Sequence, residues 1–129
     1  MISEDSMNSE ATTNRKLKRL TIAFCGDIML GGEVGKYIRT STVADWVQDV
    51  SRVWREADLL IGNLECPCVL NAKPIEAPPS KVTLHASAER LQEMAGAGFS
   101  AVTLANNHIM DCGPLGLAET TRGLDRAGI

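Results

Sequence analysis

The sequence predicts an α/β fold with a largely parallel sheet, on the basis of three observations. Short apolar runs rich in β-branched residues alternate with segments whose apolar residues recur at helical spacing. Three of the apolar runs end in a compact polar cluster, as strands do where open α/β sheets bind ligands. The 129 residues, 44% of them hydrophobic and 22% charged, suffice for one modest domain with a core.

The first half of the chain is predicted to run strand, helix, strand. Residues 20–25 are apolar and β-rich and are followed by a glycine, so they are predicted to form a buried strand. Residues 43–56 are predicted to form a helix, because their apolar residues follow one helical face and Thr42 and Asp45 have capping-box spacing. Residues 58–62 form the second predicted strand. The apolar helical face consists of Val43, Trp46, Val47, Val50, Val53 and Trp54.

The second half repeats this alternation after a long connection. Residues 66–81 contain four prolines and are predicted to be a loop, with a brief strand at 82–85. A helix at 87–97, capped by its first residue, is followed by a strand at 101–104 and a helix at 114–127. The residues expected to be buried are Leu91, Met94 and Ala95 in the first helix and Leu117, Thr121 and Leu124 in the second.

Residues 1–19 are expected to be a polar, disordered tail, and residues 20–129 the N-terminal part of a domain truncated at its C-terminus. The chain ends after a helix and glycine exit like the one that precedes strand 101–104, so a further strand is expected. The tail lacks the apolar centre of a secretory signal, and no run approaches the roughly 18 apolar residues of a membrane helix. A cytoplasmic location is therefore expected.

Charge and composition argue against two classes of partner and site. Thirteen Lys and Arg against sixteen Asp and Glu give a net charge of −3, and only five residues are aromatic, so no nucleic-acid partner is expected. Four cysteines lack the spacing of a zinc site. Cys25 is expected in the core, while the role of Cys66 and Cys68, including that of a nucleophile served by His108, stays open. Dinucleotide, P-loop and serine-elbow motifs are absent.

The polar clusters after three predicted strands carry the candidate chemistry. They contain Asp27, then Asn63 and Glu65, then Asn106, Asn107 and His108. Each cluster alone is an ordinary turn, but the carboxyl ends of parallel strands share one crevice, so we expect the three to meet. Oxygen donors with one imidazole suit a divalent ion such as manganese, iron or zinc and equip metal-assisted hydrolysis. His85 lies outside these clusters and is expected to be a structural histidine.

Three parts of the sequence resemble a known family. They are GDIMLGG at 26–32, ADLLIGNLECP at 57–67, and AGF at 97–99 with LANNHIMDCG at 104–113. In this order they resemble the CapA family of bacterial poly-gamma-glutamate capsule biosynthesis proteins, and the similarity runs from about residue 20 to 129. That family is similar to calcineurin-like metallophosphatases. The resemblance therefore implies a partial α/β/β/α sandwich with a two-metal site at the strand ends.

The resemblance also implies a role for each matching residue. Asp27 matches the metal ligand of the first strand, and Glu65 stands where a bridging carboxylate is expected. Asn107 matches the amide that binds metal, and His108 the acid that protonates the leaving group. Met29 stands where metallophosphoesterases have a histidine, as in CapA proteins generally, which alters one metal position. The supporting candidates are Asn63 and Asn106.

The resemblance implies a protein linked to poly-gamma-glutamate or capsule biosynthesis whose complete domain is a metal-dependent phosphoesterase. Its expected partners are a phosphate ester or the capsule polymer, and other capsule-synthesis proteins. The later histidine motifs of the family are missing, so activity is expected only when the missing C-terminal half completes the site. The alternatives are a non-catalytic accessory for polymer binding or export and an inactive fragment. Family members are often membrane-associated or extracytoplasmic, in contrast to the cytoplasmic location expected from this N-terminus.

Overall fold

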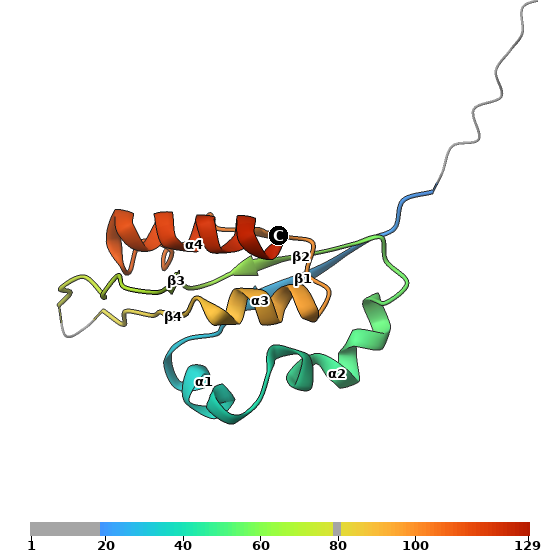
Figure 1. Cartoon of the computed structure of the whole chain (residues 1–129), viewed down its shortest axis with the longest axis horizontal. Coiled ribbons are helices and arrows are strands. Elements are labelled where there is room, and N and C mark those ends of the chain that lie inside the picture. Colours follow the sequence, from blue (N-terminus) through green and yellow to red (C-terminus); the bar gives the residue numbers. More distant parts are fainter. Residues whose placement is uncertain (1–18, 79–80) are drawn as a thin grey trace, which may run out of the picture.

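The computed structural model describes residues 19–78 and 81–129, and its main sheet is parallel (Figure 1). The strands of this sheet, bonded in the order β1-β2-β5, are β1 (Ile22–Ile28), β2 (Leu59–Leu64) and β5 (Ala101–Thr103). The helices are α1 (Gly32–Tyr37) and α2 (Val43–Trp54) between β1 and β2, α3 (Glu89–Gly96) before β5, and α4 (Gly113–Ala127) after it. A short 3-10 helix, η1 (Ile38–Thr40), separates α1 from α2. The predicted α/β class, with parallel strands alternating with helices, is confirmed.

A second, two-stranded parallel sheet lies beside α4. Its strands are β3 (Cys68–Val69) and β4 (Ala86–Ser87). The Cys68 amide donates to the Thr120 hydroxyl of α4 at 2.9 Å. The Glu119 carboxylate accepts the amides of the three residues directly after β3, Leu70, Asn71 and Ala72, at 2.8, 3.1 and 3.1 Å. These bonds fix the chain after β3 to α4.

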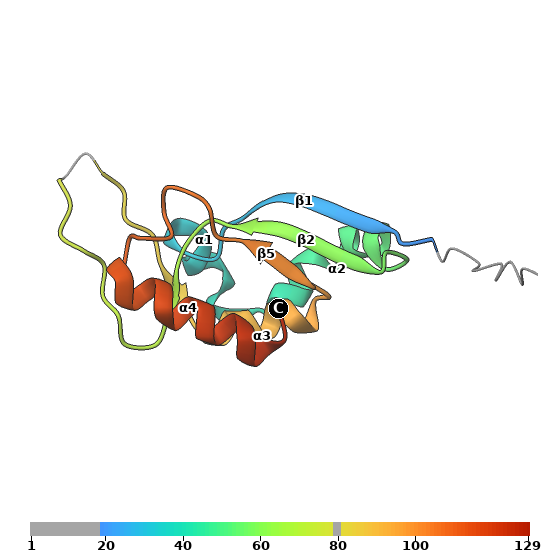
Figure 2. The ribbon, with the colours of Figure 1, turned by 90° about the horizontal axis from the view of Figure 1, so that it is seen from above.

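One face of the main sheet packs on the helices. Figure 2 shows α3 and α4 on the same side of β1, β2 and β5. Along β2 the side chains of Leu60 and Leu64 are buried, whereas the side chain of Leu59, the first residue of the strand, is exposed. This is the alternation expected of a strand. The core beneath this face includes Leu30, Ile38, Val43, Leu60, Leu64, Leu91, Met94, Phe99 and Leu124.

The opposite face of the main sheet is left open by the described residues. Phe24 is 75% exposed and Ile22 40% exposed, although both belong to β1. Their neighbours Ala23 and Cys25 point the other way and pack against the core. The expectation of a core Cys25 is therefore met in part, since its side chain is half-buried.

Several predicted strand boundaries were wrong. The first strand continues past Gly26 to Ile28, because a register irregularity between Phe24 and Asp27 lets it keep pairing with β2. Residues 82–85 form no strand, and the pairing begins at Ala86. At Leu84 the backbone amide donates to a side chain, Asp111, in place of a neighbouring strand.

The helices also differ in detail from their predictions. The capping box of Thr42 and Asp45 is confirmed, but α1 was not predicted. The apolar face of α2 is mostly uncovered among the described residues, since Val53 is 79% exposed. Residue 87 does not cap α3, which begins at Glu89 after Ala88. In α4 the buried threonine is Thr120, because its hydroxyl bonds β3, and the predicted Thr121 is exposed.

The predicted tail lies outside the described residues except for Arg19, which is exposed. Within the described part of the chain, no helix is both long and apolar enough to cross a membrane.

Candidate functional site

The register of β1 on β2 brings two of the three polar clusters together. Asp27 is paired with Asn63 across the two strands. The Asn63 side-chain amide donates to Asp27 Oδ1 at 2.9 Å and to Glu65 Oε1 at 2.5 Å. One neutral amide group thus holds two carboxylates at the carboxyl end of the sheet.

The third cluster joins this pair through Asn106. Its side-chain amide donates to Asn63 Oδ1 at 3.0 Å and to the Leu64 carbonyl at 2.8 Å. Its own Oδ1 accepts the backbone amides of His108 and Ile109, both at 3.0 Å. An asparagine that binds the backbone two and three residues on fixes a tight turn. A continuous chain of hydrogen bonds therefore links the ends of β1, β2 and β5.

His108 follows this turn and is oriented by a residue that was not assigned a role in the sequence. Its Nδ1 lies 2.7 Å from Asp111 Oδ2, and the imidazole side chain is 19% exposed. A carboxylate on Nδ1 fixes the ring and leaves Nε2 free to transfer a proton. The signal in the sequence is the spacing of three between His108 and Asp111.

Asp111 is fully buried, and its carboxylate also contacts the segment that contains Lys81 and Leu84. Its Oδ2 also accepts the amide of Leu84 at 2.8 Å, and its Oδ1 lies 3.6 Å from Lys81 Nζ. Burial raises the pKa of the Asp111 carboxyl, but the bonds from His108 and Leu84 and the charge of Lys81 outweigh it, so the pKa lies below its ordinary value. Asp111 is therefore an ionised positioning residue for His108.

Asn107 stands apart from this network. Its side chain is exposed and makes no hydrogen bond with any described residue, although its neighbours Asn106 and His108 are both bonded. The structure thus joins Asp27, Glu65, Asn63 and Asn106, and places Asn107 at the surface beside them.

The donor set fits part of a divalent-metal site. Asp27 and Glu65 share one amide, so their like charges lie close together, and a hard divalent cation is well matched to such oxygens. Among the residues that the structure describes, no three His, Cys, Asp or Glu side chains form a group able to hold a metal ion. The carboxylates would therefore need amide oxygens or further ligands.

Cys66 and Cys68 closely follow Glu65 in the chain and have a structural role. Both are fully buried. The hydrogen bond between the two thiols lowers the pKa of Cys66 against the effect of burial, helped by the amides of Leu30 and Gly31, and raises the pKa of Cys68 well above its usual value. With none of its surface exposed, Cys66 is not placed to attack a substrate. It joins the segment after β1 to the segment after β2.

Comparison with known proteins identifies the family. A model of the bacterial capsule synthesis protein family PGA_cap matches residues 21–129. The chain belongs to that family. The match covers β1 to α4, and with them every residue of the hydrogen-bond network that joins the three strand ends.

Two curated relatives agree with this membership. The chain is 29% identical over 117 residues to the capsule biosynthesis protein CapA of Bacillus anthracis, covering 90% of this chain and 28% of the relative. It is 31% identical over 101 residues to the PGA biosynthesis protein CapA of Bacillus subtilis (strain 168), covering 78% and 26%. The chain thus spans about a quarter of the length of these PGA_cap relatives.

Proposed function

We propose that this PGA_cap chain contributes one side of a metal-dependent phosphoesterase site that acts in the biosynthesis of the capsule polymer poly-gamma-glutamate. The observation that carries the proposal is the chain of hydrogen bonds from Asp27 through Asn63 and Asn106 to the His108 turn. If the three polar clusters only formed turns, each could do so without hydrogen bonds to the other two.

In this proposal each group of the network has its own task. Asp27 and Glu65, with Asn107 at the surface beside them, hold a divalent metal ion, such as manganese, iron or zinc. When bound, the metal supplies Lewis-acid polarisation of a phosphate ester. His108 gives a proton from Nε2 to the leaving-group oxygen, and Asp111 keeps the ring in the orientation that this transfer needs. Asn63 and Asn106 keep the ligand-bearing strand ends in place.

Metal binding is the first test. Asp27→Asn and Glu65→Gln each remove one of the two carboxylate charges that the Asn63 amide holds together, so we expect each to weaken manganese or zinc binding to this chain by about tenfold or more. Isothermal titration calorimetry measures the affinity. Asp49→Asn in α2 is the matched control, because its carboxylate is exposed and far along the chain from the network. Equal affinities in all four proteins would remove the metal role.

Hydrolysis is the second test. In a protein that also supplies the other side of the site, His108→Gln is expected to keep the metal affinity and to lose metal-dependent release of p-nitrophenol from p-nitrophenyl phosphate. If that protein, without the substitution, binds the metal and releases no p-nitrophenol, the result favours the non-catalytic function in polymer binding or export. The metal and hydrolysis experiments together separate the site from the reaction.

A further inference from the structure

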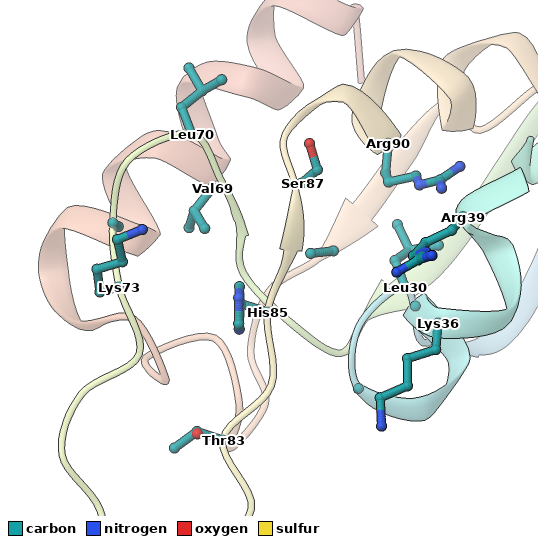
Figure 3. Close-up of a pocket in the computed structure, with 14 residues that line it drawn as sticks. Leu30, Lys36, Arg39, Val69, Leu70, Lys73, Thr83, His85, Ser87 and Arg90 are labelled. Carbon is teal, nitrogen blue, oxygen red and sulfur yellow. The ribbon is translucent and has the colours of Figure 1, made fainter.

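A cavity outside the candidate metal site is lined by basic side chains. Its volume is about 580 Å³, within the size range of small-molecule sites. Figure 3 shows its labelled wall residues, which come from α1 and η1, from the segments around β3 and β4, and from α3. None of Asp27, Glu65, Asn106 or His108 lines it.

The charge of this cavity is one-sided. Its basic residues are Lys36, Arg39, Lys73 and Arg90, with His85 between them, and none of the described residues that line it is Asp or Glu. This is unexpected by chance in a chain whose formal net charge is −3. The cavity therefore favours a ligand with negative charge.

Two of these cations are available to a ligand. Lys36 pairs with Glu33, and Arg90 is held by Glu93 at 2.7 Å and by two backbone carbonyls. Arg39 and Lys73 are exposed and form no ion pair with any other described residue. Figure 3 shows them on opposite sides of His85, so they present two separated positive charges, not one cluster.

The wall between them is built by an extended segment. Side chains alternate along an extended chain, so Thr83, His85 and Ser87 share one side and all three line the cavity. The segment lies against the start of α1 because Gly31 has no side chain: a Cβ there would be 2.5 Å from the His85 carbonyl oxygen. Apolar lining residues, among them Leu30, Val69 and Ala72, complete the cavity.

We propose that this cavity binds an extended chain of carboxylates, as a site separate from the candidate metal site. Two separated cations, hydroxyl donors between them and apolar walls match a ligand whose carboxylates are spaced by methylene groups. A single phosphate would require converging donors. The choice of a polymer rests on the proposed function, since poly-gamma-glutamate is a polymer of this chemistry.

The two sites are connected through the chain. Leu84, between the lining residues Thr83 and His85, donates its amide to Asp111, which orients His108. A polymer held in the cavity would therefore lie beside the segment that supports the proposed acid, so the cavity is placed to hold a polymer near the reaction.

Binding of fluorescently labelled poly-gamma-glutamate oligomers to this chain tests the proposal, measured by fluorescence anisotropy in EDTA. The double variant Arg39→Gln/Lys73→Gln is expected to lower the affinity about tenfold, and added salt to weaken binding of the unmodified chain. The control is Arg52→Gln/Arg55→Gln, which removes the same charge from exposed positions in and after α2. It is expected to leave the affinity unchanged.

Three outcomes would overturn the proposal. They are no binding of the oligomer, an equal loss of affinity in the two double variants, and displacement of the oligomer by equimolar inorganic phosphate. The last would make the cavity a phosphate site. Because EDTA removes divalent metals, these outcomes are independent of the metal titration of Asp27→Asn, so a failure of this site is distinguishable from a failure of the proposed function.

Discussion

Asp111 shows how one buried carboxylate serves both stability and the candidate site. It bonds His108 and the amide of Leu84, and these bonds stabilise its charged form. A carboxyl whose folded pKa lies below its unfolded pKa stabilises the protein above the unfolded value, and this contribution is lost as the pH falls through the folded value. The stability of the chain should therefore decline in acid partly through Asp111.

The variant Asp111→Asn tests this at the residue scale. At about pH 7 we expect the free energy of unfolding to fall by about 1–3 kcal/mol, because a buried charge-assisted bond to His108 is lost. Below about pH 4 the difference from the unmodified chain should narrow, because the Asp111 carboxyl then takes up a proton in the unfolded chain, and at lower pH in the folded chain as well. Urea unfolding at both pH values measures it. Asp125→Asn, an exposed position in α4, is the control, and a pH-independent difference for Asp111→Asn would contradict the argument.

At the scale of elements, the first turns of α4 depend on a glycine. A Cβ at Gly116 would lie 2.3 Å from the Cβ of Cys112 and in contact with Val69 and Pro67. The same turn of α4 carries Thr120, whose hydroxyl bonds the Gly116 carbonyl at 2.8 Å and accepts the Cys68 amide. The start of α4 at Cys112 therefore leaves no room for a side chain at Gly116, whereas Val69 of β3 would be at ordinary van der Waals distance.

Gly116→Ala is expected to destabilise the chain by about 1–3 kcal/mol, the usual cost of overpacking. Thermal unfolding measures the loss, and hydrogen exchange at the Cys68 amide should quicken. Gly96→Ala in α3 is the matched control, because no atom lies within 4 Å of a Cβ there, and it should be neutral or stabilise by up to about 1 kcal/mol. If both substitutions had the same effect, the close contact with Cys112 would not be the cause.

At the scale of the whole molecule, the sheet has one packed face and one open face. Phe24 and Ile22 of β1 lie on the open face, and Val53 adds a separate apolar surface on α2. Exposed apolar patches of this kind promote association. The open face also ends at Asp27 and Asn63, so whatever covers it lies next to the candidate metal site.

We expect Phe24→Gln to reduce concentration-dependent self-association of this chain and its binding of the dye ANS, because the largest exposed apolar side chain of the sheet is removed. Sedimentation velocity and ANS fluorescence measure the two effects. Leu115→Gln in α4, where the side chain is 56% exposed, is the control for a general change in surface polarity. Equal reductions in the two variants would show that the open face has no special part in association.

The sequence by itself determined the alternation of strands and helices, the capping of α2 and the polar residues at the strand ends. These features are local, since periodicity and capping depend on residues a few positions apart. The family followed from the same segments. The 3.6-residue period of a helix and the two-residue period of a strand indicate which side chains of an element share a face.

Only the tertiary structure decided what each face meets and which atoms converge. The apolar face of α2 is largely exposed, His85 is exposed and lines a cavity, and Asp111 takes the role of orienting His108. The register irregularity in β1 pairs Asp27 with Asn63, so that the Asn63 amide bonds Asp27 in addition to Glu65. Register and packing join residues that are far apart in the chain, so no local pattern encodes them.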